Sequence, residues 1–113
     1  MSAAELAEIE TLVGSGGDAD DILRDVVAVL ARRYAWAGIL FVEAGELTLG
    51  PAAGVPQEQQ RTRLPVTFNG TLVAELAVDG APEEDRTFLE RVAELVAGPC
   101  LVGWDTGGET WEP

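Results

Sequence analysis

Few of the side chains that commonly do chemistry in enzymes occur in this chain of 113 residues. Histidine and lysine are absent, and all seven basic residues are arginine. Histidine general-base catalysis, histidine metal ligation and Schiff-base lysine chemistry therefore have no side chain to use. Ser2 and Ser15 are the only serines. One thiol and the carboxylates remain as candidates for chemistry.

The thiol belongs to Cys100, the single cysteine of the chain. One cysteine cannot form an internal disulfide. No basic residue lies near it in the sequence to lower its pKa, so it is a poor nucleophile. Free cysteine is most often a small buried hydrophobic residue, and we expect that role for Cys100.

One group of carboxylates, Asp18, Asp20 and Asp21, comes directly after the glycine-rich residues 14–17. A phosphate-binding loop would place Lys-Ser/Thr after such glycines, and none follows. A calcium loop starting at Asp18 would need Gly and Glu where Leu23 and Val29 stand. The pattern instead predicts a flexible joint followed by a helix N-terminus. We predict no catalytic residue, no metal site and no cofactor.

Acidic residues outnumber basic ones 20 to 7, for a net charge of −13. This charge disfavours nucleic acid and anionic membrane surfaces as partners. The N-terminus lacks the pattern of a secretory signal, and the longest apolar stretch, 96–104, is far shorter than the roughly 20 residues of a membrane span. We therefore expect a cytoplasmic protein.

The elements that would position these residues follow from periodicity. Apolar residues at helical spacing predict helices over 3–13 and 19–34, and a third helix from about Pro82 that stops or kinks at Pro99. Strand-like runs cover 36–42, 46–49, 64–68 and 71–78, and Asn69-Gly70 marks a hairpin between the last two. Two hairpins with flanking helices predict an antiparallel α+β domain.

These residues resemble the GAF family of small sensory domains. The likeness is strongest where 64–66 precede the hairpin at Asn69-Gly70 and 71–78 follow it, although Ala74 replaces the family's usual glycine. Residues 36–40 and 46–51, which end in Leu-Gly-Pro, are similar to the free methionine-(R)-sulfoxide reductases in particular. The resemblance implies a GAF-like antiparallel sheet of about four to five strands, flanked by an N-terminal helix pair and a C-terminal helix.

The chain departs from the family between 52 and 63, where the resembled reductases carry redox cysteines and this sequence has none. Because Cys100 matches no catalytic position, the departure argues against enzyme activity. The same segment usually supplies the lid of a small-molecule pocket, and here it is short. The apolar sheet face that it would cover needs another cover, for which the candidates are the loop itself, the N-terminal helix, a second copy of the chain, or a ligand.

Residues 1–17 are thus predicted as an N-terminal helix and joint, 18–104 as one GAF-like domain, and 105–113 as a flexible tail. Our main hypothesis is a non-catalytic regulatory or scaffold domain that acts as a homodimer. The alternatives are a small-molecule sensor with a reduced apolar pocket and an acidic adaptor that binds a protein partner. The predicted ligand-binding residues are Trp36, Phe41 and Phe68, and the predicted dimer interface comprises Leu23, Val27, Leu30, Leu89 and Val96.

Overall fold

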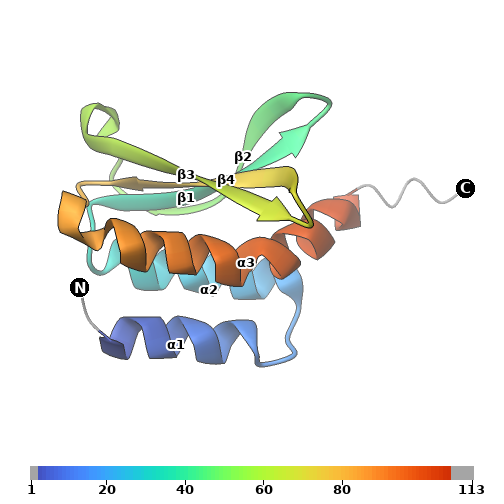
Figure 1. Ribbon diagram of the computed structural model, residues 1–113, viewed down its shortest axis with the longest axis horizontal. Helices are drawn as coiled ribbons and strands as arrows, with labels where there is room; N and C mark the ends of the chain where they lie inside the picture. Colours follow the sequence, from blue (N-terminus) through green and yellow to red (C-terminus); the bar gives the residue numbers. More distant parts are fainter. Residues whose placement is uncertain (1–2, 108–113) are drawn as a thin grey trace, which may run out of the picture.

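A four-stranded sheet lies on a layer of two helices, and a third helix lies beneath that layer (Figure 1). The computed structural model describes residues 3–107. The helices are α1 (Ala3–Val13), α2 (Ala19–Ala31) and α3 (Arg86–Gly107), and the strands are β1 (Trp36–Glu43), β2 (Glu46–Gly54), β3 (Arg61–Phe68) and β4 (Thr71–Asp79). Short 3-10 turns, η1 (Glu58–Gln60) and η2 (Glu83–Asp85), precede β3 and α3.

The strands are arranged in the order β2-β1-β4-β3, and every neighbouring pair is antiparallel. Two hairpins, β1–β2 and β3–β4, are joined side by side through the pairing of β1 with β4. The hairpin predicted at Asn69-Gly70 is present, and both residues have positive φ, of 53° and 80°. This conformation is the one that favours Asn-Gly in a two-residue hairpin turn. The predicted α+β fold with four strands is confirmed.

One face of the sheet packs against α2 and α3, and this interface is the core of the domain. Ala37 and Ile39 of β1 point into this core, because alternate residues of a strand lie on the same face of the sheet. Each fully buried large apolar side chain contributes roughly 1.5–3 kcal/mol relative to an exposed one. The large residues with almost no exposure include Leu23, Leu30, Ile39, Leu64, Leu76, Leu89, Val26, Val78 and Val92.

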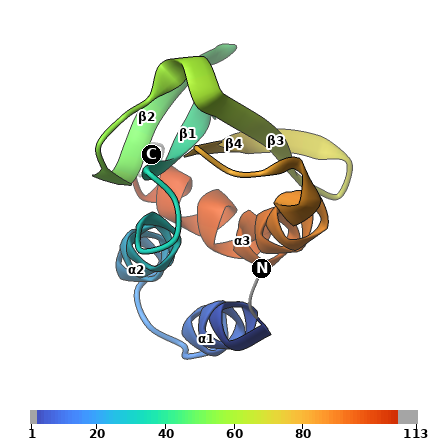
Figure 2. The same cartoon turned by 90° about the vertical axis from the view of Figure 1, so that its left-hand side faces the viewer.

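Helix α1 forms a layer of its own against α2 and α3, on the side away from the sheet (Figures 1 and 2). Its bounds agree with the predicted helix over 3–13. Ile9 is its one fully buried side chain among the described residues, whereas Leu6, Leu12 and Val13 are partly buried against the core.

Several predicted boundaries were wrong by a few residues. The second helix ends at Ala31, not at residue 34, because Tyr34 leaves the helix to donate a hydrogen bond of 2.6 Å from its hydroxyl to the Asp85 carboxylate. Strand β2 continues to Gly54, and β3 begins at Arg61. These extensions are paired with β1 and β4, so tertiary pairing supports segments that carry weak local patterns.

Pro99 lies inside α3, and the helix runs past it to Gly107. Proline removes one helical hydrogen bond at this point, and the backbone stays helical beyond it. Of the predicted tail, residues 108–113 lie outside the described residues. Within the described part of the chain, no helix has the length and apolar character needed to cross a membrane.

Candidate functional site

The face of the sheet that points away from α2 and α3 is the candidate site, and we call it the outer face. Side chains of directly paired residues lie on the same side of a sheet, so the strand register defines this face. Its rows across the four strands are Gly54–Trp36–Asp79–Arg61, then Ala52–Gly38–Ala77–Arg63, then Leu49–Leu40–Glu75–Pro65, and finally the pair Leu47–Val42.

The end of the outer face at the first row is closed by the chain's own side chains. Arg61 donates two hydrogen bonds to the carboxylate of Asp79, at 2.7 and 2.9 Å. Its guanidinium carbon also lies 4.3 Å from the centre of the Trp36 ring, at the distance of a cation–π contact. The backbone N–H of Gln57 donates to the same carboxylate at 2.7 Å. The short segment between β2 and β3 is thereby tied down on this end of the sheet.

The positive charge of Arg61 compensates for the burial of the negatively charged Asp79 carboxylate. Asp79 is fully buried, and a buried carboxylate without a partner would be strongly unfavourable. The hydrogen bonds from Arg61 hold the pKa of Asp79 below its usual value, against the opposing effect of burial. The carboxylate in turn raises the pKa of the Arg61 guanidinium. The pair therefore stays ionised and joined at neutral pH.

Trp36 occupies the space above the second row. A Cβ atom added at Gly38 would lie 2.4 Å from the Cη2 atom of the Trp36 ring, so the indole covers Gly38 directly. Trp36 itself is almost fully buried beneath Arg61. A ligand lying against this part of the sheet would have to displace the indole.

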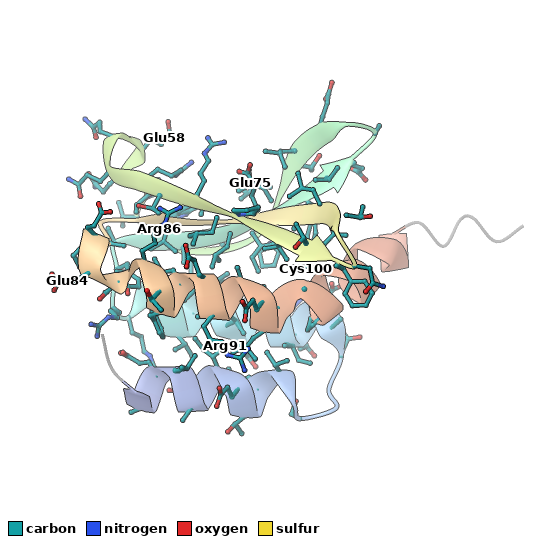
Figure 3. The ribbon with its side chains drawn as sticks, in the orientation of Figure 1. Glu58, Glu75, Glu84, Arg86, Arg91 and Cys100 are labelled. Atoms are coloured by element: carbon teal, nitrogen blue, oxygen red, sulfur yellow. The ribbon has the colours of Figure 1, made fainter. Side chains whose placement is uncertain are left out.

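The other half of the outer face is open and apolar. Leu40 and Val42 are partly buried, whereas their partners Leu49 and Leu47 on β2 are 55% and 38% exposed. Glu75 stands at the boundary between the two halves, on the side of the sheet away from the helices (Figure 3). Its carboxylate pairs with Arg63 at 3.5 Å.

The predicted ligand-binding aromatics do not come together. Trp36 lies on the outer face. Phe41 lies on the opposite face of β1, packed against the core, because successive side chains of a strand point to opposite sides of the sheet. The ring of Phe41 lies over Gly50, where an added Cβ would be 2.2 Å from its Cε2 atom. Phe68, 39% exposed, sits at the β3–β4 turn. The predicted slot between these three residues is thus wrong, because the sheet separates Trp36 from Phe41.

The residues predicted for a dimer interface all lie inside one chain. Side chains buried within a single copy are not on the surface that a second copy would contact. Sequence periodicity identified the apolar stripes of two helices, but the partner of those stripes is the chain's own sheet. The correction applies to Leu23, Val27, Leu30, Leu89 and Val96, whose exposed fractions are 0–1%.

Cys100 is fully buried on α3, as predicted, and lies on the opposite side of the sheet from the outer face (Figure 3). Burial raises the pKa of its thiol to about 12. The thiolate, which is the nucleophilic form, is therefore scarce at neutral pH.

We expect the Cys100 thiol of the folded protein to resist modification. With a disulfide dye at pH 8, the native protein should release almost no chromophore over minutes, and one equivalent after denaturation in guanidinium. Rapid reaction of the native protein would contradict the burial of this thiol. A Leu49→Cys variant, whose thiol would be exposed, provides the reactive control.

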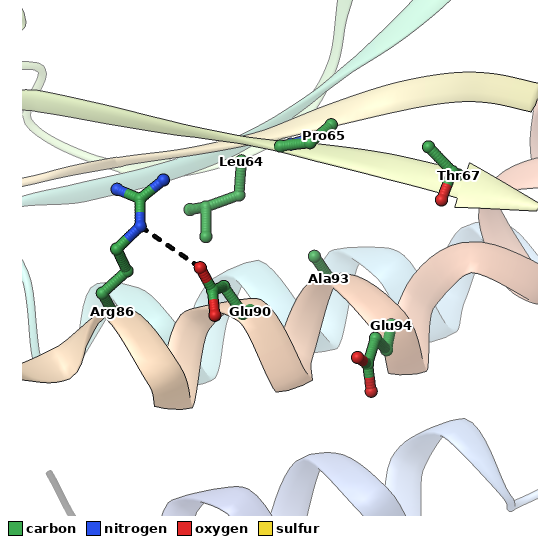
Figure 4. Close-up of a pocket in the computed structure, with 7 residues that line it drawn as sticks. All are labelled: Leu64, Pro65, Thr67, Arg86, Glu90, Ala93 and Glu94. Carbon is green, nitrogen blue, oxygen red and sulfur yellow. Dashed lines mark hydrogen bonds and ion pairs between the residues drawn. The ribbon is translucent and has the colours of Figure 1, made fainter. Parts of the chain in front are cut away.

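A separate groove of about 400 Å³ runs between the free edge of β3 and α3 (Figure 4). Leu64 of β3 and Ala93 of α3 line the groove from its two sides, and Arg86 forms an ion pair of 3.2 Å with Glu90 on the helix side. The edge carries Pro65 and an irregularity in pairing at Val66/Thr67, two features that hinder the addition of another strand. The groove brings together no nucleophile and base.

The Arg61–Asp79 pair is the feature that sequence reasoning missed. The sequence pattern leaves both Arg61 and Asp79 outside the predicted strands over 64–68 and 71–78. A two-residue turn at Asn69-Gly70 continued in regular register would place Val78, not Asp79, opposite Arg61. The shift in register between Val66 and Thr67 moves the pairing by one residue and brings the two charges together.

The sequence matches no family model and no curated protein. Solved structures with a similar fold include the free methionine-R-sulfoxide reductase of Neisseria meningitidis in complex with its substrate, with a TM-score of 0.72 and 16% identity over 94% of this chain and 95% of that one. The GAF domain of an Acinetobacter phosphoenolpyruvate-protein phosphotransferase gives 0.71 and 14% over 90% and 95%. A Burkholderia vietnamiensis protein described as a GAF sensor gives 0.71 and 20% over 84% and 90%. The similar folds thus belong both to enzymes and to sensory domains.

Proposed function

Because the chain has the fold of GAF domains, we propose that it is a non-catalytic regulatory or scaffold domain that acts through self-association. The observation that carries the proposal is the closed end of the outer face, where Trp36 and the Arg61–Asp79 pair fill the space above the sheet. Because the chain's own side chains occupy this end of the sheet, we infer that the domain acts through its surface.

The position of the thiol supports the non-catalytic part of the proposal. Reduction of a sulfoxide by thiol chemistry forms a sulfenic acid that a second thiol resolves. This chain has one cysteine, and its sulfur is buried away from the outer face. Incubation with free methionine-(R)-sulfoxide and dithiothreitol should therefore give no more methionine than a Cys100→Ala variant gives. Turnover that depends on Cys100 would overturn this part.

Self-association is tested by native mass spectrometry of the purified protein, supported by sedimentation velocity from 1 to 100 µM. We expect a mass of two bare chains whose share grows with concentration, since association follows mass action. A protein that stays monomeric across this range would contradict the proposal.

The open half of the outer face favours a second candidate, a small-molecule sensor with a reduced pocket. Leu47 and Leu49 are exposed beside Leu40 and Val42, and Glu75 provides a polar group at their border. Pockets for small molecules combine apolar walls with a few polar groups. The same mass spectrum decides between the candidates, because a sensor purified with its ligand would carry extra mass on each chain.

A further inference from the structure

Helix α1 is attached to the rest of the domain differently from α2 and α3. Six side chains of α2 are buried, whereas Ile9 is the one buried side chain in the described part of α1. Two surface hollows border the α1 layer, one of about 340 Å³ along its seam with α2 and one of about 250 Å³ beneath its C-terminal end. Close packing is the rule in protein cores, so α1, which contributes Ile9 alone among its described side chains to the buried core, is packed less completely than α2.

Ion pairs connect α1 to the layer beneath it. Each of its three carboxylates pairs with an arginine of the layer beneath: Glu5 with Arg33 at 3.1 Å, Glu8 with Arg32 at 2.6 Å, and Glu10 with Arg91 at 3.8 Å. Figure 3 shows Arg91 directed from α3 toward α1. The chain has only seven basic residues, and three of them are used here. The face of α2 and α3 under α1 is thus a surface suited to an acidic amphipathic helix.

The connection to α2 allows α1 to leave this surface. Residues 14–18 are exposed, and an added Cβ at Gly16 would meet no atom within 4 Å. Gly16 has a φ of +78°, so the chain reverses here through a conformation that glycine adopts easily. Straightening this joint would break no side-chain packing.

We propose that the α2/α3 face binds the α1 helix of a second copy of the chain, so that two copies exchange α1 and form a symmetric dimer. Exchange of an identical element is a low-cost route to a dimer, because every contact of α1 is remade in the partner. The helix that fits the surface in charge and shape is α1 itself. The inference rests on the proposed function, since it assigns the surface through which the chain self-associates.

Cross-linking across the α1–α2 contact tests the exchange in the full-length chain. In a Cys100→Ala background, Glu8→Cys and Arg32→Cys place two thiols where the ion pair stood, and a short bis-maleimide joins them. We expect most of the product from isolated dimer to have the mass of two chains after denaturation. The matched control is Glu43→Cys with Thr48→Cys, whose wild-type side chains are hydrogen-bonded at 3.2 Å within one hairpin and which should cross-link within single chains.

The outcomes separate the exchange from the proposed function. If the native dimer of the Glu8→Cys, Arg32→Cys variant gives a cross-linked product with the mass of one chain, the exchange is overturned and self-association stands. Absence of any dimer of the wild-type protein would overturn both.

The length of the joint provides a second test of the exchange. Deletion of Gly16 and Gly17 removes residues needed to reverse the chain, and should shift the population toward dimer. Lengthening the joint with Gly–Ser pairs should shift it toward monomer. The opposite response of the two variants, measured by sedimentation velocity, would contradict the exchange.

Discussion

Replacing Arg61 with alanine is expected to lower the free energy of unfolding by about 3–5 kcal/mol, because it leaves the buried carboxylate of Asp79 without its charged partner. Urea denaturation of wild type and variant measures the difference. Arg63→Ala is the matched control: its ion pair with Glu75 is partly exposed, and we expect a loss of about 1 kcal/mol or less. Equal losses for the two variants would contradict the structural role of the Arg61–Asp79 pair.

The same prediction has a pH dependence of defined sign. Because the folded-state pKa of Asp79 lies below the ordinary value of 3.8, the pair stabilises the fold fully above that value. This contribution is lost as the pH falls through the folded-state pKa. The difference in stability between wild type and Arg61→Ala should therefore be constant from pH 5 to 8 and shrink below pH 3.8. A difference that grows on acidification would contradict this assignment.

A double replacement separates the loss of the pair from the burial of an unpaired charge. Arg61→Met together with Asp79→Leu removes both charges and keeps apolar volume. We expect it to recover most of the stability lost in Arg61→Ala, since well-packed apolar residues often replace a buried ion pair at little cost. The N–H of Gln57 loses its acceptor in the double variant, so recovery should be incomplete.

Replacing Trp36 with alanine should lower the free energy of unfolding by about 3–5 kcal/mol and open a cavity on the outer face. The indole is almost fully buried between Gly38 and Arg61, so its removal leaves a space that the sheet cannot close. Thermal unfolding measures the loss. Phe68→Ala is the control, because its half-exposed ring at the β3–β4 turn should contribute about 1 kcal/mol.

Added indole should raise the melting temperature of Trp36→Ala and leave that of the wild type unchanged. A ligand that binds only the folded variant stabilises it by mass action, and an apolar cavity binds an apolar molecule of matching shape. Equal stabilisation of both proteins would show that the outer face of the wild type already has room for a ligand. That result would favour the sensor function over the scaffold function.

Much of the fold follows from local patterns in the sequence. Apolar spacing predicted the bounds of α1 to the residue. The Asn69-Gly70 turn fixed the β3–β4 hairpin, because few other residue pairs adopt two consecutive positive φ angles so readily. The absence of histidine and lysine and the single cysteine removed most catalytic chemistries before any geometry was known. These inferences need only the residue types and their nearest neighbours along the chain.

The tertiary structure decided how these pieces meet. One irregularity in the β3–β4 register places Asp79 opposite Arg61. In a regular register Arg61 would face Val78, and the two charged side chains would not be paired. The apolar stripes of α2 and α3 look equally suited to a second copy or to a sheet, and the sheet covers them. Register and partner choice depend on the sum of many contacts between residues far apart in the chain, to which each local pattern contributes only a part. The sequence therefore determined the secondary-structure elements and excluded most catalytic chemistries. The closed end of the outer face and the separate α1 layer arose from long-range packing.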